Sequence, residues 1–500
     1  MKTSEKLTLA IVVISVAAAT ALYGVWEDKV WLFAPLLMLI TIALAVWAMS
    51  SGFRVQSSEL KLGVRGRRTE DGRLTTANGD GSDSSTSTHP YSHTPKLSGH
   101  NGDSTSHIPH PTTHKSISIP PGGGLLMLFC LYSAIMIPFS VIPYEAKIST
   151  LRIGAYIGVY WATASILSRF PRRKAVWMTV FGFLILVALY SVVQHKIAPN
   201  IIFGVERYAD YRDRLAGTYQ CPNHIAHLFQ MWIPFCLVFL FLPQFGWFWR
   251  ICFGYSIPLF AILIYQTQSR AGLLGLVTGL ATTALLLMLR KSRRLFYIAL
   301  LVVPLLGAGT LGGLWMGSEM FRDRMQPVVD VASKFLAGDV EEAISLNFRP
   351  QTWADGMVMF ADRPITGFGP GNYELTFPEY RHRVFANRVL TVHPHNEVVE
   401  MLTEYGLIGA ALIVWVLISF CIPMIRLIKT SDRATHALPA VAILAALAGT
   451  AVHGFFDFEL RIFPNALMLS LLAGCAVSPL LQMESRKQRT RKKEFRQDDG

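Results

Sequence analysis

The sequence predicts an all-α, polytopic transmembrane helical bundle of about twelve spans, with a largely helical external loop domain. Of the 500 residues, 52% are hydrophobic and only 16% are charged, whereas about a quarter of the residues in a typical soluble domain are charged. The apolar residues also lie in long uninterrupted blocks. Because about 20 apolar residues let a helix cross the hydrocarbon core, we expect these blocks to be membrane spans.

The predicted spans follow the apolar blocks along the chain. The first block has the length of a signal peptide, but a second block follows almost at once and no small-residue cleavage site stands out, so we expect a retained helix. An even number of spans puts both termini on one side of the membrane. The spans are 7–26, 30–49, 124–143, 153–168, 175–194, 223–243, 248–267, 269–289, 295–316, 398–424, 435–453 and 462–482.

The loops between the spans indicate which side of the membrane each one faces. Alternate connections are rich in Lys and Arg, and so is the C-terminal tail. Because cytoplasmic loops carry an excess of these residues, we expect the basic face to be cytoplasmic and the opposite face periplasmic. The same rule accounts for the net charge of +13 without a nucleic-acid partner. The six cysteines show no CxxC spacing, so neither a zinc site nor a disulfide framework is indicated.

The longer connections complete the expected domain organisation. Residues 51–122 are rich in Ser, Thr, Gly and His and almost lack large apolar residues, so we expect a disordered linker. The loop at 317–397 has helical patterns around 319–336 and 352–360. The expected parts are two N-terminal helices (1–50), the cytoplasmic linker (51–122), a transmembrane core (123–316) with an external loop (195–222), a large periplasmic loop (317–397), three C-terminal helices (398–482) and a basic cytoplasmic tail (483–500).

A histidine motif precedes the span at 398–424. His395 follows a proline that can open a helix, and helical spacing places it on one face with Val399, Leu402, Gly406 and Gly409. This position places the imidazole at the external mouth of the span. An imidazole can exchange protons near neutral pH. A helix-capping or interfacial histidine is the alternative interpretation.

An acidic stripe follows on the same predicted helix. It consists of Glu397, Glu400 and Glu404. Carboxylates near a membrane are costly unless they face water or a cation. These side chains are therefore candidates either for contacts with sugar hydroxyls and for orienting His395, or for pairing with arginines of the loops.

Two arginines stand at the external ends of other spans. Arg214 precedes the span at 223–243, and Arg270 lies in a very short turn between two apolar blocks. A permanent charge is expensive there and marks a functional candidate, and the planar guanidinium suits bidentate phosphate binding. The alternative is an arginine whose stem lies along apolar surface while its head reaches water.

Further candidates lie in the other external loops. His453 and Asp457 precede the last span, and Arg349 lies in the large loop. We regard them as candidate contacts for a sugar or an acceptor, although a packed aromatic turn explains His453 and Asp457 equally well. All these groups fall on the non-basic face, at the mouths of different helices. That arrangement is typical of a site open both to the outside and to the membrane.

These residues resemble a known family. The pattern His395-Asn396-x9-Gly406-x2-Gly409 resembles the signature of the bacterial O-antigen ligase and O-antigen polymerase superfamily, which includes protein O-oligosaccharyltransferases. The Arg214-to-Asn223 stretch, the Ser269-Arg270 turn and the run from Pro364 to Asn372 are similar to other blocks of the family, in the expected order, and the resemblance covers roughly 124–482. Two departures are Cys221, where the family often has Asn, and the linker at 51–122, which looks like an insertion.

The resemblance implies an inverting, metal-independent glycosyltransferase of cell-envelope polysaccharide biosynthesis, without a cofactor. Its donor would be a glycan on undecaprenyl diphosphate in the bacterial inner membrane. Arg214 and Arg270 would hold the diphosphate, and His395, oriented by Asn396, would take the acceptor's proton. The acceptor would be lipid A core for a lipopolysaccharide ligase, a growing glycan for a polymerase, or a protein hydroxyl. We favour the ligase because the large loop directly precedes the His-Asn motif.

Two alternatives lie outside this class. A transporter or flippase for a lipid-linked sugar suits a chain with many spans, but such proteins place ionisable residues near the midplane of broken helices. Here the interiors of the predicted spans are nearly free of charge. A structural membrane scaffold is the other alternative, which Arg270 and His395 disfavour.

Overall fold

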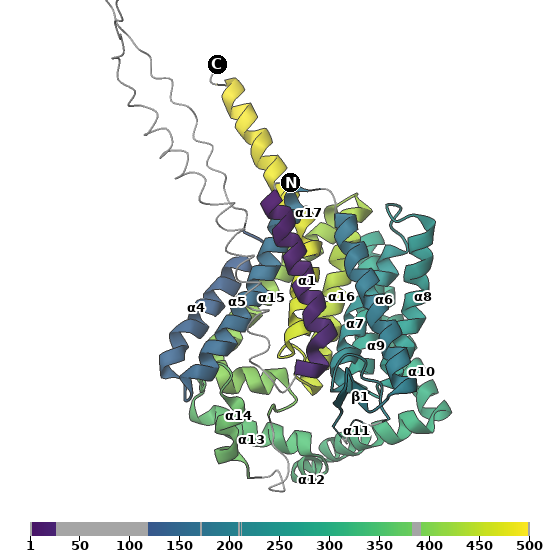
Figure 1. Cartoon of the computed structure of the whole chain (residues 1–500), viewed down its shortest axis with the longest axis vertical. Helices are drawn as coiled ribbons and strands as arrows, with labels where there is room; N and C mark the ends of the chain where they lie inside the picture. The colour runs from purple at the N-terminus through teal and green to yellow at the C-terminus, as the bar shows by residue number, and fades with distance from the viewer. Residues whose placement is uncertain are drawn as a thin grey trace, which may run out of the picture. The chain divides into compact units, whose positions relative to one another are not determined.

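The structure is a computed structural model that describes residues 3–26, 119–170, 173–208, 211, 213–382 and 392–498. The described elements are helices, apart from one short hairpin of β1 (Ile201–Ile202) and β2 (Val205–Glu206), in which Ile201 pairs antiparallel with Glu206. Figure 1 shows long helices side by side, with short helices gathered at one of their ends. The expected all-helical class is therefore confirmed. The predicted span at 30–49 and almost all of the predicted linker at 51–122 lie outside the described residues.

The long helices coincide with the predicted spans inside the described residues. They are α1 (Thr3–Trp26), α4 (Gly123–Met136, continued by the 3-10 turn η2, Ile137–Phe139), α5 (Pro143–Arg169), α6 (Arg173–Ile197), α7 (Pro222–Phe239), α8 (Trp247–Gln266), α9 (Arg270–Lys291), α10 (Arg293–Gly317), α15 (Glu397–Thr430), α16 (Ala434–Phe456) and α17 (Phe463–Asp498).

Within the described residues, seven of these helices are long and apolar enough to cross a membrane. They are α6, α8, α9, α10, α15, α16 and the Phe463–Lys487 part of α17. The predicted count of about twelve spans is therefore not confirmed. The span predicted at 30–49 lies outside the described residues. For two others the cause is compositional, because α7 carries polar residues such as His224, His227 and Gln230, and α4 with η2 is short.

The burial pattern of these helices fits a lipid environment. Helix α16 is largely buried against α9 and α7, and α17 packs on α5 and α1. In contrast, only 6% of the apolar window of α10 is buried, although the helix is strongly apolar. Exposed large side chains such as Leu301 and Leu305 would be unfavourable in water. A helix with an exposed apolar surface is stable in the hydrocarbon core of a membrane, because all its backbone hydrogen bonds are made within the helix. The chain is thus a multi-pass membrane protein.

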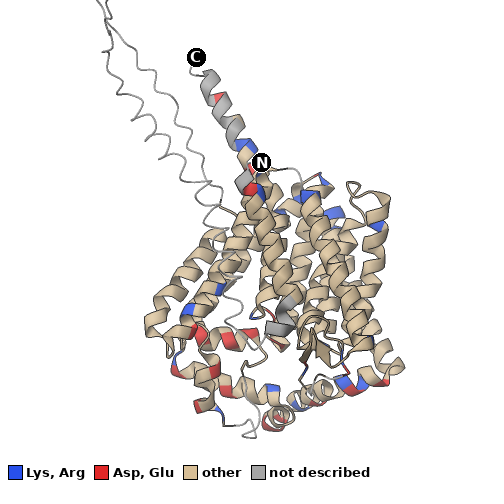
Figure 2. Cartoon of the chain, viewed as in Figure 1, with Lys and Arg blue, Asp and Glu red and all other residues tan. Residues whose placement is uncertain are grey.

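The short helices form the region that covers one end of the long ones. They are α11 (Glu319–Ala337), α12 (Val340–Ser345), α13 (Phe348–Asp362), α14 (Tyr373–Thr376) and the 3-10 turn η4 (Phe377–Tyr380). In Figure 1 they lie at the end where α7, α9 and α15 begin and where α16 finishes. Figure 2 shows that many of the acidic residues gather with these short helices, whereas the opposite helix ends carry mainly Lys and Arg.

Helix α15 is broken at Gly406, where the expected helix was continuous. Gly406 has φ 61° and ψ −166°, which glycine adopts far more easily than other residues. The backbone groups freed by the break are not left unpaired. The carbonyls of Thr403 and Glu404 accept from the N–H groups of Phe368 and Gly369, and the N–H of Leu407 donates to Pro364. The Gly-Pro turn at 364–372 is therefore docked into the opened helix.

We predict that Gly406→Ala destabilises the protein because a Cβ at this positive φ would run into the backbone of Ile365 and Thr366. The expected cost is about 1–3 kcal/mol of folding free energy, visible as a lower melting temperature of the detergent-purified protein. Gly154→Ala in α5 is the matched control, since a Cβ there meets nothing within 4 Å. Equal melting temperatures for the two variants would contradict this account of the break.

Candidate active site

His395 lies just before α15 rather than on its helical face. Its φ is 53°, and the helix begins at Glu397 with Asn396 as the N-cap. The Asn396 side chain accepts from the N–H groups of Val398 at 2.9 Å and Val399 at 3.1 Å. The expectation that His395 shares a helix face with Val399 is therefore wrong. Asn396 holds the start of the helix, which is what an N-cap does, and it positions His395 only through the backbone.

The partner of His395 is Asp457, which directly follows α16. The Nδ1 atom of His395 lies 2.9 Å from Oδ1 of Asp457, whose side chain is fully buried. A carboxylate at this distance fixes the tautomer with the proton on Nδ1 and leaves Nε2 as the basic nitrogen. The rings of Phe348 and Phe458 pack edge-on against the imidazole, while 23% of the His395 side chain stays exposed. The ring is oriented and still accessible.

The environment sets the protonation of this pair. Burial lowers the pKa of His395 below its ordinary value of 6.5, and Asp457 opposes that shift. Burial on its own would raise the pKa of Asp457, but the imidazole of His395, its hydrogen bond and the nearby Arg349 hold that pKa well below its usual range. At neutral pH the pair is therefore a neutral imidazole beside a carboxylate. This is the form in which Nε2 can accept a proton.

Asp457 also joins the histidine to two arginines. Its Oδ2 accepts from Nδ2 of Asn223 at 2.6 Å, and Asn223 in turn accepts from Arg214 at 2.9 Å. Arg349, from the first turn of α13, lies 3.5 Å from the same oxygen and donates to the carbonyl of Phe456. The first turn of α7, the loop before it, α13 and the end of α16 thus meet at one carboxylate.

Arg214 is held in place by the backbone around it. Its Nε donates to the carbonyl of Thr267 at 2.8 Å. Arg207 braces the same loop by donating to the carbonyls of Pro199 and Arg214. Burial lowers the pKa of Arg214, which reflects the cost of keeping a guanidinium from water. The loop is built to hold this charge against the start of α7.

Arg270 is the first residue of α9, capped by Ser269, whose hydroxyl accepts from the N–H of Gly272. The guanidinium groups of Arg349, Arg324 and Arg214 all act on Arg270 electrostatically. Among the residues that the structure describes, Arg270 makes no hydrogen bond or ion pair through its guanidinium. Like charges held together in a partly buried place favour an anion that neutralises them. The cluster of Arg214, Arg270, Arg324 and Arg349, here called the arginine cluster, is thus suited to a phosphate-containing ligand.

The carboxylates of the acidic stripe on α15 are paired with other groups of the same chain. Glu400 lies 3.3 Å from Arg461 and 2.8 Å from Nδ1 of His393, and Glu404 lies 2.6 Å from Arg461. Glu397 accepts from the N–H of Leu460. These pairs connect α15 to the loop between α16 and α17. They agree with the alternative interpretation of the acidic stripe, in which its carboxylates pair with arginines of the loops. The predicted sugar contacts of Glu397 and Glu400 stay predictions.

His453 lies inside the bundle rather than at its surface. Its side chain is fully buried, with Nδ1 at 2.8 Å from Gln230 and Nε2 at 3.2 Å from Glu459. Glu459 also accepts from Asn465 at 3.0 Å. His453 belongs to a polar network behind the His395–Asp457 pair, and its predicted sugar contact stays a prediction.

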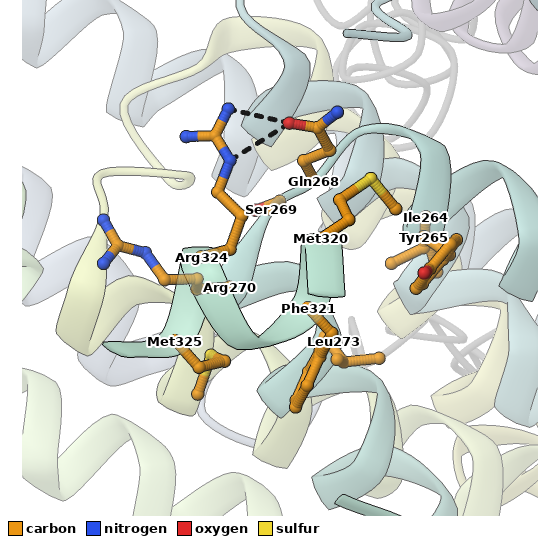
Figure 3. Close-up of a pocket in the computed structure, with 10 residues that line it drawn as sticks. All are labelled: Ile264, Tyr265, Gln268, Ser269, Arg270, Leu273, Met320, Phe321, Arg324 and Met325. Atoms are coloured by element: carbon orange, nitrogen blue, oxygen red, sulfur yellow. Dashed lines mark hydrogen bonds between the residues drawn. The ribbon is translucent and has the colours of Figure 1, made fainter. Parts of the chain in front are cut away.

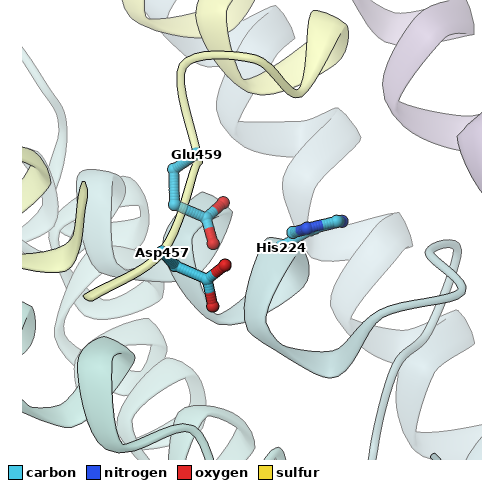
Figure 4. Close-up of side chains that lie close together, drawn as sticks. All are labelled: His224, Asp457 and Glu459. Carbon is cyan, nitrogen blue, oxygen red and sulfur yellow. The ribbon is translucent and has the colours of Figure 1, made fainter. Parts of the chain in front are cut away.

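One group of side chains near this network has the composition of a metal site. Ligand atoms of His224, Asp457 and Glu459 lie within 4.8 Å of one another, and Figure 4 shows the two carboxylates beside the imidazole. However, Oδ1 of Asp457 already accepts from His395 and from the N–H of Phe458, and Oδ2 accepts from Asn223 and Arg349. Binding a cation would require Asp457 to release these donors. The donor set favours a hydrogen-bonded hub over a metal centre.

The structure brings Arg214, Arg270, Arg349, His395 and Asp457 to one end of the helices. Asn223 and Arg324 were not predicted as members of the site. A signal existed for Asn223, which stands in the same sequence block as Arg214, and for Arg324, which follows an apolar span closely. The sequence did not indicate that Asp457 is the partner of His395.

The matches to known proteins concern the middle of the chain. Residues 255–414 match the family model described as O-antigen ligase. The matched stretch includes Arg270, Arg324, Arg349 and His395 and ends inside α15. A comparison with curated proteins gives no match. The resemblance drawn from the motifs is therefore confirmed, and residues 255–414 of this membrane protein carry an O-antigen ligase family domain.

Proposed function

We propose that the chain is an inverting glycosyltransferase that moves a glycan from undecaprenyl diphosphate to an acceptor hydroxyl. The observation that carries this proposal is the His395–Asp457 pair beside the arginine cluster, because it combines a proton acceptor with a site for an anionic leaving group. The O-antigen ligase domain at 255–414 supports the same class of reaction. The reaction needs no metal if the cluster itself neutralises the diphosphate.

In the proposed reaction the acceptor hydroxyl gives its proton to Nε2 of His395 while its oxygen attacks the anomeric carbon. The bond from that carbon to the diphosphate oxygen breaks, and its electron pair leaves with the diphosphate. Arg214 and Arg270 stabilise the negative charge that develops there. Asp457 stabilises the imidazolium that forms. Attack opposite to the leaving group inverts the anomeric configuration.

We place this site at the periplasmic face of the bacterial inner membrane, with both termini in the cytoplasm. The helix ends opposite the site carry mainly basic residues, whereas acidic residues are frequent among α11–α14 (Figure 2). An excess of Lys and Arg is typical of cytoplasmic connections. In this orientation the segment at 317–397 is the large periplasmic loop and the segment at 51–122 is a cytoplasmic linker.

Among the acceptors we favour a lipid A core sugar, as for an O-antigen ligase. Helix α13, one of the short helices α11–α14, supplies Arg349 and Phe348 to the surroundings of His395 and Asp457, so a large acceptor could be positioned by the same segment that completes the site. A growing glycan or a protein hydroxyl is the alternative acceptor.

We predict that deletion in the native host makes full-length carrier-linked glycan accumulate while surface polysaccharide is lost. A ligase acts after chain growth, so its substrate is the finished glycan. Mass spectrometry of the lipid-linked glycans provides the measurement. Accumulation of single repeat units would point to a polymerase instead, and an unchanged glycan pool with unchanged surface polysaccharide would contradict the proposed function.

We predict that His395→Ala lowers the rate of glycan transfer by about 10²-fold or more, because the general base is lost. Transfer is measured with purified protein and a carrier-linked glycan, and the melting temperature monitors folding. His195→Ala, at the end of α6, is the matched control and should keep normal transfer. Wild-type rates for the His395 variant would remove the proposed base.

We predict that the acidic limb of kcat/KM lies below pH 6.5, the ordinary pKa of histidine. The neutral imidazole is the active form, and burial lowers its pKa, so activity is lost only as the pH falls through that lowered value. Asp457→Asn removes a charge that raises this pKa, so its limb should move to still lower pH while the plateau rate falls. Asp330→Asn on α11 is the control. A limb that stays in place in the Asp457 variant would contradict the pairing.

A further inference from the structure

A small cleft lies between the end of α8, the start of α9 and α11. Its apolar wall consists of Ile264, Tyr265, Leu273, Met320, Phe321 and Met325. Its other side carries Gln268, Ser269, Arg270 and Arg324. In Figure 3 the guanidinium groups of Arg270 and Arg324 extend toward one side, away from Ile264, Tyr265, Leu273 and Phe321. The cleft therefore joins an apolar surface directly to a positively charged one.

Arg324 lies at the edge of this cleft and pairs with an amide group. Its Nε and Nη2 donate to Oε1 of Gln268 at 3.0 and 2.7 Å, as the dashed lines in Figure 3 mark. An amide oxygen orients a guanidinium without neutralising it. Among the described residues, Arg324 forms no ion pair with a carboxylate. Further N–H groups of this guanidinium remain to bind an anion.

The contact with Gln268 fixes α11 against the turn between α8 and α9. Gln268 has φ 53°, an unfavourable backbone conformation for a residue other than glycine. A strained backbone conformation of this kind persists only where the surrounding structure holds it in place, and such residues are common at ligand-binding sites. A second contact links the same elements, because the hydroxyls of Tyr265 and Ser318 lie 2.7 Å apart. Arg324 is thus held close to Arg270, although it comes from a different helix.

The charges around the cleft favour an anion with more than one negative charge. Arg270 and Arg324 line the same cleft, and Arg349 and Arg214 also act on Arg270 electrostatically. Asp457, the carboxylate paired with Arg349, is already shared with His395 and Asn223. A diphosphate carries enough charge and enough oxygens to contact several guanidinium groups at once. An apolar chain attached to that diphosphate would have a matching surface in the adjoining cleft.

We propose that Arg324 is a further diphosphate-binding residue and that the cleft holds the first isoprene units of the lipid carrier. This inference rests on the proposed function and assigns α11 a part in binding the donor. The carrier enters with its isoprenoid chain against Leu273, Phe321 and Met325, and its diphosphate spans Arg324 and Arg270. A phospholipid headgroup would offer a single phosphate to the same cations, so the two sources can be distinguished by experiment.

The test measures binding of undecaprenyl diphosphate to the full-length protein in nanodiscs. Arg324→Ala should weaken binding about tenfold or more, since a charge-assisted contact is lost. Arg322→Ala is the matched control on the same helix, because its guanidinium donates, within the part of the chain that the structure describes, to the carbonyls of Trp315 and Met316, and binding should be unchanged. Met325→Trp should narrow the cleft and weaken the binding of undecaprenyl diphosphate. Inorganic diphosphate, which has no isoprenoid chain, should inhibit that binding as well in this variant as in the wild type.

The outcomes separate this inference from the proposed function. Arg270→Ala serves as the reference for loss of the diphosphate site. If Arg270→Ala loses binding while Arg324→Ala and Met325→Trp keep it, the role of α11 is overturned and the proposed function stands. If the wild-type protein does not bind undecaprenyl diphosphate, both are overturned. The inference would also be overturned if phosphatidylglycerol competed for the site as well as undecaprenyl diphosphate does, because the cluster would then bind a single phosphate as well as a diphosphate.

Discussion

The buried carboxylate of Asp457 is the interaction on which the candidate site depends. It accepts from His395, Asn223 and Arg349, which come from three separate parts of the chain. Removing a carboxylate from water is costly unless its oxygens are fully hydrogen-bonded and cations lie close to it. Here the compensating donors are the same groups that the proposed reaction uses. The requirement to satisfy one buried charge therefore also assembles the base and part of the cation cluster.

The arrangement explains how a site can form at the ends of helices without a rigid sheet. The break of α15 at Gly406 lets the turn at 364–372 dock into the helix, and the partly buried Arg461 holds Glu400 and Glu404 on the same segment. These contacts fix the start of α15, and hence the backbone of His395. Within the arginine cluster, Arg349 pairs with Asp457, whereas Arg270 and Arg324 form no ion pair with a carboxylate among the described residues. An anionic ligand would therefore improve the charge balance of the cluster.

The sequence predicts the class of fold and the main chemical groups better than it predicts their relations. Long apolar blocks identify the helices, and the motifs identify Arg214, Arg270 and His395, because both signals are local. The partners of these residues are distant in sequence: Asp457 is 62 positions from His395 and 234 from Asn223. Such contacts leave no local pattern. The positive φ of His395 and the break at Gly406 depend on tertiary hydrogen bonds, which is why a continuous helix was expected.

The most direct measurement of the central claim is a double-mutant cycle between His395 and Asp457, with the rate of glycan transfer as the readout. If the carboxylate acts through the imidazole, the double variant His395→Ala, Asp457→Asn should be no slower than His395→Ala alone. If the two losses multiply instead, the residues contribute independently, and a single site built around Asp457 is contradicted.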